Sequence, residues 1–439
     1  MNKILSLSAQ HPLSGEVTLP GDKSLSHRAA LFASLAEGVS VIDRFLDSGV
    51  TRAMLEALTE LGIEWNLEGD RLTVTGKGLH GYRKPLKRLY CGGSATTIRM
   101  LAGALAASGT PAVLDGSPGL RKRPMNRITE PLAKMGLRIA SENGCAPMII
   151  PGRDPSLSLH AITYSLSIAS AQVKSCLILA ALAGDAVSVI TEPAHSRDHT
   201  ERMLTAMGAK ITPIESTTIR VEPLTAPLKP LQIKLSGDIS SASFLIVAAL
   251  IVPGSSIVIK DINLNRTRTG LLDALRHMGA KIRIESQHRL CSEQVGDIHV
   301  DASDLHGVTI QGDDIVRMID EIPALAVAAS FAKGCTTIRD AQELRYKETD
   351  RIDTLCKGLS KLGVEVEERP DGMTIRGGTL QGGECESYGD HRLAMALSLA
   401  GLVSPKPVRV HHAEAVSQSF PDFVKVLTTL GVVPKLENQ

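Results

Sequence analysis

A six-fold internal repeat spans this sequence and restricts the folds that it can adopt. In each unit an amphipathic helical segment ends in Leu-Gly or Met-Gly and is followed by a strand-like segment. The repeat glycines are Gly62, Gly136, Gly208, Gly279, Gly363 and Gly431. They lie 68 to 84 residues apart, so six units account for the 439-residue chain. A fixed period indicates one structural unit used repeatedly, and glycine supplies the left-handed residue that ends a helix.

Each unit also has a second helical segment, rich in Ala and Leu, that runs into a turn and a strand. Residues 30–43, ALFASLAEGVSVID, are an example. Such helices lack a polar face and are expected to be buried, whereas the Gly-ended helices carry charges such as Glu56 and should lie at the surface. Residues 63–76 and 364–377 alternate in polarity and predict hairpins. Each unit therefore is predicted to be β-α-β-α-β-β, and the fold class is α/β.

The buried helices begin with the most unusual polar stretches of the chain. These stretches are GDKSLSHR (21–28), GGSATTIR (92–99), SIASAQVKS (167–175), GDISSAS (237–243), RMIDEIP (317–323) and YGDHR (388–392). Ser and Asp at these places can act simply as helix caps. The cations in the same first turns are unfavourable for the helix dipole, which favours a role for them in binding an anion. They are Lys23, Arg28, Arg99, Lys174 and Arg392.

The net charge of the chain is only +1, so these cations are a local concentration of positive charge. The chain has 48 Lys and Arg against 47 Asp and Glu, and two further basic clusters stand at 120–124 and 344–351. We therefore expect a polyanionic small molecule as ligand, rather than nucleic acid or a membrane surface. Asp320 and Glu348 lie among the cations. They are either surface ion pairs, which contribute little, or a general acid and base.

Other site classes have little support. The sequence has no phosphate-binding P-loop, dinucleotide fingerprint or nucleophile elbow. His195 and His199, or His411 and His412, could mimic metal ligands, but without supporting cysteines or an H-E-x-x-H motif, solvated or hydrogen-bonded histidines are favoured. The seven scattered cysteines and the absence of a signal-peptide pattern predict a cytoplasmic protein. The longest apolar run, 244–252, is too short to span a bilayer.

Several motifs, taken together, resemble those of the 5-enolpyruvylshikimate-3-phosphate (EPSP) synthase family. They occur in the family's order over nearly the whole chain. They are LPGDKSLSHRAALFASLAEG (19–38), LDGSPGLRKRP (114–124), ASAQVKS (169–175), GDISSASF (237–244), IDEIP (319–323), ELRYKETDR (343–351) and GDHR (389–392).

The resemblance implies a two-domain inside-out α/β barrel with three repeats in each domain. One domain would comprise residues 1–21 and 238–439, the other 22–237, with the active site in the cleft between them. The family transfers the enolpyruvyl group of phosphoenolpyruvate to the 5-hydroxyl of shikimate 3-phosphate and releases phosphate, on the route to chorismate and the aromatic amino acids. The resemblance implies no cofactor or metal, a monomer, and glyphosate as a weak competitor.

Residue roles carried over by motif are expectations from this resemblance. The catalytic residues would be Asp320, Glu348 and Lys23. The shikimate 3-phosphate ligands would be Lys23, Ser24, Arg28, Ser170, Ala171, Gln172, Arg197, Asp320 and Lys347. The phosphoenolpyruvate ligands would be Lys23, Ala95, Arg123, Gln172, Arg351 and Arg392. Which carboxylate handles which proton stays open.

Three positions depart from the family pattern. Ala95 stands where glycine is frequent, which predicts that glyphosate is sterically disfavoured. Asp47 replaces an Asp often found near Gly49, and Gln418 stands where some members have Lys. The sister enzyme, UDP-N-acetylglucosamine enolpyruvyl transferase, is one alternative, although the loop at 119–124 lacks its cysteine. A non-catalytic binding protein built from the six repeats is another.

Overall fold

The computed structural model describes residues 2–438 and divides the chain into two compact units. Unit 1 contains the N-terminal segment up to Pro20, residues Ser236–Arg289 and the chain from Gln294 onward. Unit 2 contains Gly21–Leu235 and the short segment Leu290–Glu293. Within residues 2–438 no helix has the length and apolar character that a bilayer crossing requires.

The strands of the described chain form six four-stranded sheets, three in each unit. In unit 2, written in spatial order, they are β14 (Gln232–Lys234), β3 (Glu37–Asp43), β5 (Arg71–Lys77) and β4 (Glu64–Glu68); β6 (Leu89–Tyr90), β7 (Ala112–Asp115), β9 (Cys145–Ile150) and β8 (Ala140–Glu142); and β10 (Thr163–Ser165), β11 (Ser188–Thr191), β13 (Thr218–Val221) and β12 (Ile211–Glu215). The first pair in each sheet is parallel and the other two are antiparallel.

The sheets of unit 1 follow a similar plan. They are β2 (Ser14–Thr18), β15 (Ser256–Asn263), β17 (Glu293–Asp301) and β16 (Lys281–Leu290); β18 (Thr309–Ile310), β19 (Cys335–Ile338), β21 (Gly372–Arg376) and β20 (Glu365–Arg369); and β22 (Gly383–Glu386), β23 (Val408–His411), β1 (Lys3–Ala9) and β24 (Val432–Asn438). The hairpins expected at 63–76 and 364–377 are confirmed as β4–β5 and β20–β21.

The chain has two main crossovers between the units, and the strand before each crossover pairs within the unit that the chain is about to leave. β2 directly precedes the first buried helix of unit 2, yet it pairs in parallel with β15 of unit 1. β14 directly precedes the first buried helix of unit 1, yet it pairs in parallel with β3 of unit 2. Each unit therefore completes a sheet with a strand whose following helix belongs to the other unit.

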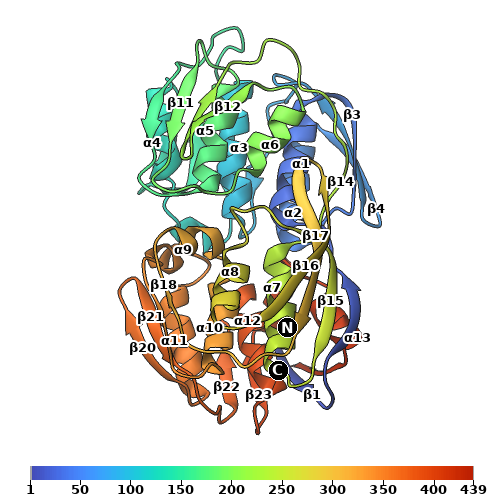
Figure 1. Cartoon of the computed structure of the whole chain (residues 1–439). Coiled ribbons are helices and arrows are strands. Elements are labelled where there is room, and N and C mark those ends of the chain that lie inside the picture. The colour runs from blue at the N-terminus through green and yellow to red at the C-terminus, as the bar shows by residue number, and fades with distance from the viewer. Residues whose placement is uncertain (1, 439) are drawn as a thin grey trace. The chain divides into compact units, whose positions relative to one another are not determined.

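The two predicted helix classes are present in every repeat. The buried helices are α1 (Lys23–Leu35), α3 (Ala95–Ser108), α5 (Ala171–Ala181), α7 (Ile239–Ile251), α10 (Ile322–Ser330) and α12 (His391–Leu399). Within each unit three of them lie side by side, for example α1, α3 and α5 in Figure 1. Their apolar side chains form one core cluster in each unit.

The Gly-ended helices cover the outside of each core and keep exposed charged faces. They are α2 (Gly49–Glu60), α4 (Asn126–Lys134), α6 (His199–Ala206), α8 (Gly270–His277), α11 (Arg351–Lys361) and α13 (Phe423–Thr429). The six repeat glycines have φ between 84° and 105°, which confirms their predicted role as left-handed helix ends. Five short helices complete the fold: α9 (Asp313–Met318), η1 (Leu120–Lys122), η2 (Gln342–Tyr346), η3 (Ala400–Leu402) and η4 (Ala413–Gln418).

Candidate functional site

The three buried helices of unit 2 begin at capped N-termini. The side chains of Asp22, Ser94 and Ser170 accept hydrogen bonds from the backbone N–H of Leu25, Thr97 and Val173, respectively. This confirms the capping role that the sequence predicts. The expected ligands Lys23, Ala95 and Ala171 are the first residues of α1, α3 and α5. Other N–H groups of these first turns have no partner within the helix and can donate to an anion.

Arg28 joins α1 to the two neighbouring helices. Its Nε donates to Thr200 Oγ1 at 2.7 Å, and its Nη2 donates to Ser175 Oγ at 3.0 Å. Its Nη1 donates to the carbonyl of Ser24 at 3.0 Å. The guanidinium is buried, so it orders the first turn of α1 as well as placing positive charge there.

Gln172 is held against the start of α3. Arg99 Nη1 donates to Gln172 Oε1 at 2.6 Å, and Gln172 Nε2 donates to Thr96 Oγ1 at 3.0 Å. Arg99 Nη2 also donates to the carbonyl of Pro124 at 3.0 Å, which fixes the chain directly after Arg123. Arg123 is largely buried at the end of η1. The structure thus connects Gln172 with the segment that carries Arg123, 49 residues earlier in the sequence.

The position of Lys174 predicts that it binds an anionic ligand, but its charge is paired within the protein. Its ammonium lies 2.7 Å from Glu192 Oε1 and 2.8 Å from Glu201 Oε1, inside the protein. Burial would lower the pKa of Lys174, but Glu201 and Glu192 raise it. The expectation that this cation serves an anionic ligand is wrong, because the buried Glu192 and the mostly buried Glu201 already compensate its charge.

Arg197 lies in the loop before α6, next to the buried Ser196. The Ser196 N–H donates to Glu192 Oε1 at 3.1 Å, and its carbonyl lies 3.4 Å from Lys174 Nζ. Its hydroxyl is buried and has no hydrogen-bond partner in the structure. The only sequence signal for Ser196 was its place next to Arg197.

Unit 1 brings five predicted residues together from three separate segments. The Asp320 carboxylate lies 3.5 Å from Arg351 Nη1, and 3.8 Å from both Lys347 Nζ and Arg392 Nη2. Arg392 Nη1 also donates to the carbonyl of Asp320 at 2.9 Å. Glu348 Oε2 accepts from Arg351 Nη2 at 2.6 Å. Two partly exposed carboxylates therefore share one group of three cations.

A fully buried carboxylate anchors this group. Asp390 caps α12 by accepting from the Arg392 N–H, and it also accepts from Arg351 Nε at 2.8 Å. Burial would raise the pKa of Asp390, but the Arg351 charge holds it below its ordinary value. Burial would lower the pKa of Arg351, but Asp390, Glu348 and Asp320 raise it. Asp390 and Arg351 are therefore both charged.

A second buried network in unit 1 has no counterpart among the predicted residues. Arg268 Nη2 donates to Asp238 Oδ1 at 2.9 Å and to Ser240 Oγ at 2.8 Å, and Ser240 Oγ contacts Glu321. Asp238, Ser240 and Glu321 lie in motifs of the family, but Arg268 does not. No local pattern marks Arg268 as the partner of Asp238, which lies 30 residues earlier.

Asp47 and Gln418 are two of the positions at which the sequence departs from the family pattern. Asp47 accepts from Arg52 Nη2 at 2.7 Å in an exposed ion pair at the start of α2. Gln418 is the last residue of η4. We assign neither a substrate contact.

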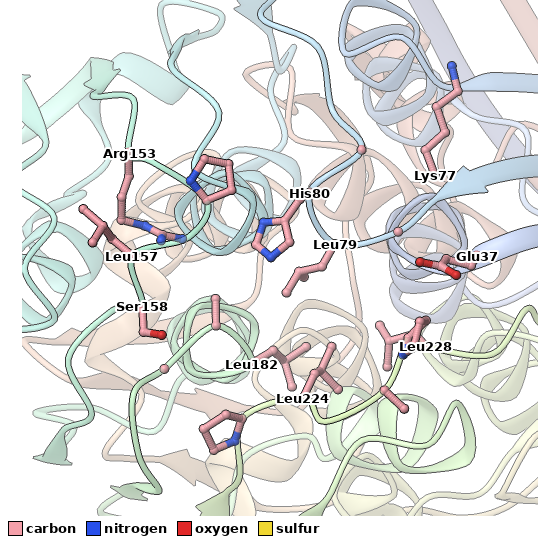
Figure 2. A pocket seen from close by; sticks show the side chains of 18 residues that line it. Glu37, Lys77, Leu79, His80, Arg153, Leu157, Ser158, Leu182, Leu224 and Leu228 are labelled. Atoms are coloured by element: carbon pink, nitrogen blue, oxygen red, sulfur yellow. The ribbon is translucent and has the colours of Figure 1, made fainter.

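A cavity of about 560 Å³ lies elsewhere in unit 2, at the C-terminal ends of α1, α3 and α5, and none of the predicted residues lines it. Figure 2 shows Arg153, His80 and several leucines around it. Arg153 Nη2 donates to the carbonyls of Ala106 and Ala107, which end α3, and a His80 ring nitrogen lies 3.3 Å from the carbonyl of Ser108. These polar groups thus serve to end α3.

Comparison with known proteins decides the family. The family model described as EPSP synthase (3-phosphoshikimate 1-carboxyvinyltransferase) matches residues 7–427. The chain belongs to the EPSP synthase family. A 3-phosphoshikimate 1-carboxyvinyltransferase of Roseiflexus sp. is 47% identical over 434 residues, which are 98% of this chain and 99% of the relative. One from Bacillus cereus is 44% identical, over 95% and 97% of the two chains.

The solved structures agree with this assignment. An EPSP synthase structure from Acinetobacter baumannii has a TM-score of 0.88 and 37% identity, and the match covers 100% of both chains. This confirms the predicted fold class. The chain is therefore a transferase of the shikimate pathway, from a family whose small-molecule substrates are shikimate 3-phosphate and phosphoenolpyruvate. The UDP-N-acetylglucosamine enzyme is not favoured as an alternative.

Proposed function

We propose that the cluster of Asp320, Lys347, Glu348, Arg351 and Arg392 supplies the acid–base pair, Asp320 and Glu348, and two phosphoenolpyruvate ligands, Arg351 and Arg392. Asp320 and Lys347 are also proposed to contact shikimate 3-phosphate. The observation that carries this proposal is the meeting of two partly exposed carboxylates with three cations within 4 Å. Arg392 and Arg351 offer guanidinium forks for the phosphate and carboxylate of phosphoenolpyruvate. The neighbouring carboxylates supply proton donors and acceptors.

We propose that the helix N-termini of unit 2 hold shikimate 3-phosphate. Ser24, Ser170, Ala171 and Gln172 lie in the first turns of α1 and α5 or directly before them, and the N-terminus of a helix favours an anion. Lys23, Arg28 and Arg197 add positive charge. Lys23, Ala95, Arg123 and Gln172 are proposed to contact phosphoenolpyruvate as well.

Both clusters act on one pair of bound substrates in this proposal, with residues 1–21 and 238–439 as one domain, 22–237 as the other, and the active site in the cleft between them. The 5-hydroxyl of shikimate 3-phosphate loses its proton to a base and attacks C2 of phosphoenolpyruvate, while an acid adds a proton to C3. The resulting tetrahedral intermediate then loses phosphate and a C3 proton, which restores the double bond. Asp320, Glu348 and Lys23 are the proposed catalytic residues for these proton transfers, and preorganised cations stabilise the developing negative charge.

The test is a phosphate-release assay with the purified chain, shikimate 3-phosphate and phosphoenolpyruvate, with product identity checked by mass spectrometry. We expect EPSP and phosphate in equal amounts. Release of phosphate only with UDP-N-acetylglucosamine as acceptor would assign the sister reaction. No turnover with either acceptor, in a folded protein that binds shikimate 3-phosphate, would support the non-catalytic alternative.

We further propose a glyphosate-tolerant, cytoplasmic monomer. Ala95 at the start of α3 is the residue that supports tolerance, because its methyl group reduces the space beside phosphoenolpyruvate. The seven cysteines are all free, which suits a reducing compartment. Light scattering after size-exclusion chromatography tests the monomer: a mass of 46.7 kDa is expected, and twice that mass would reject it.

A further inference from the structure

The β16–β17 hairpin starts in unit 1, but its tip belongs to unit 2. Its tip residues, Leu290–Glu293, are grouped with unit 2, while β15 and the remainder of the hairpin belong to unit 1. At the turn, Cys291 and Ser292 have φ of 53° and 64°. Cys291 Sγ donates to the carbonyl of Lys234, which is a unit 2 residue. The chain thus enters unit 2 a second time.

Glu293, at this tip, forms a buried pair with the first residue of α6. His199 Nδ1 lies 2.7 Å from Glu293 Oε1, and the two side chains are 0% and 1% exposed. Arg202, one turn further along α6, lies 3.9 Å from Glu293 Oε2 and donates to the carbonyl of Ser292 at 3.1 Å. The hairpin tip therefore binds the first turn of α6 through both side-chain and backbone acceptors.

Residues of the same repeat hold the loop before α6 at Ser196, before the loop reaches His199. Glu192 Oε1 accepts from the Ser196 N–H at 3.1 Å, and the same oxygen lies 2.7 Å from Lys174 Nζ. Arg197 stands between Ser196 and the His199 anchor. One end of this short segment thus depends on the Lys174–Glu192 pair, and the other end depends on Glu293.

We propose that Glu293 is a positioning residue for the phosphorylated acceptor: it holds His199 and so fixes the backbone from which Arg197 reaches shikimate 3-phosphate. This inference rests on the role proposed above for Arg197. Glu293, His199 and Arg197 all belong to unit 2. A cation held at a fixed position loses less conformational freedom when it binds the phosphate.

The same hairpin offers a matched control. Glu285 of β16 also pairs with a histidine, His299 of β17, at 3.3 Å, but the Glu285 side chain is 51% exposed. This pair has the same chemistry and lies within unit 1. Glu285→Gln therefore removes a comparable charge without touching the Arg197 loop.

The experiment measures shikimate 3-phosphate binding by calorimetry, together with kcat and both KM values. The proteins are the parent, Glu293→Gln, Glu285→Gln, Arg197→Gln and the Arg197→Gln/Glu293→Gln double variant. We expect Glu293→Gln to raise the Kd of shikimate 3-phosphate about tenfold, with smaller changes in kcat and in the KM of phosphoenolpyruvate. Because Glu293 acts through Arg197, the double variant should bind about as weakly as Arg197→Gln alone. Glu285→Gln should match the parent.

Several results would overturn the proposal: unchanged binding in Glu293→Gln, fully additive losses in the double variant, or an Arg197→Gln variant that binds normally. Failure of the parent to bind shikimate 3-phosphate would instead reject the proposed function itself. If urea unfolding shows that Glu293→Gln does not fold, Glu293→Asp replaces it. That variant keeps the charge but shortens the reach to His199, and it should weaken binding in the same direction.

Discussion

Arg351 and Asp390 form a buried ion pair whose side chains are 1% and 0% exposed. Arg351 Nε lies 2.8 Å from Asp390 Oδ2, and its Nη2 lies 3.2 Å from Oδ1. The same guanidinium contacts Glu348, whose side chain is 26% exposed. Asp390 thus fixes the orientation of Arg351 from the buried side, whereas Glu348 and Asp320, the proposed acid–base pair, are partly exposed.

Removing the Glu348 charge should affect turnover far more than stability. In Glu348→Gln, Arg351 keeps Asp390 as its buried partner, so the protein should fold and bind shikimate 3-phosphate normally. The kcat should fall by about 100-fold or more, in the range of a lost acid or base. Asp320→Asn should lower kcat by a similar factor. Steady-state kinetics and calorimetry check both variants, and lost binding with normal kcat would make these residues structural ion pairs.

Removing the Asp390 charge should instead lower stability. Asp390→Asn leaves the buried Arg351 without its main counter-charge, which typically costs about 3 kcal/mol or more. Urea unfolding measures this loss. Asp353→Asn is the control, because Asp353 forms an exposed pair with Lys357 on the same helix, α11, and its loss should cost about 0.5 kcal/mol. Equal effects of the two substitutions would contradict the anchoring role of Asp390.

Ala95→Gly should increase glyphosate sensitivity. Removing one methyl group from a fitted pocket changes affinity by about 10- to 200-fold. We expect the glyphosate inhibition constant to fall by at least about tenfold, with a smaller change in the KM of phosphoenolpyruvate. Competition assays at low phosphoenolpyruvate measure both. If the parent enzyme already has a micromolar inhibition constant, Ala95 does not confer tolerance.

His27 should make the protein less stable in mild acid. Burial lowers its pKa from 6.5 to about 4, and the ring lies between the Lys23 carbonyl and Ser94 Oγ. Between these pH values the unfolded chain binds a proton that the folded chain does not. The stability from His27 is therefore complete above pH 6.5 and is lost as pH falls toward 4, by about 2 kcal/mol at pH 5.

Urea unfolding at pH 7 and pH 5 tests this dependence. His27→Gln should lose about 2 kcal/mol less than the parent on acidification, since glutamine does not titrate. His288→Gln changes an exposed histidine and should retain the parental loss. An identical pH dependence in the parent and His27→Gln would show that His27 titrates normally in the folded protein.

The repeat could be predicted from the sequence because its signals are local. Glycine periodicity marked the six helix ends, and missing polar faces marked the buried helices. Both features depend on residues within a few turns of one another. The polar starts of those helices likewise indicated where cations and carboxylates gather. The short helix α9 and the parallel pairing of β2 with β15 and of β14 with β3 had no such local signal.

The sequence by itself determined the α/β repeat, its buried helices and the motifs that carry the family resemblance. Only the tertiary structure decided the partner of each charge. It paired Arg351 with Asp390 across 39 residues, His199 with Glu293 across 94, and Lys174 with two glutamates. The physical reason is that burial makes an unpaired charge costly, so the fold supplies a counter-charge from wherever the chain returns. Whether a cation faces a ligand or a carboxylate of the protein therefore depends on long-range packing.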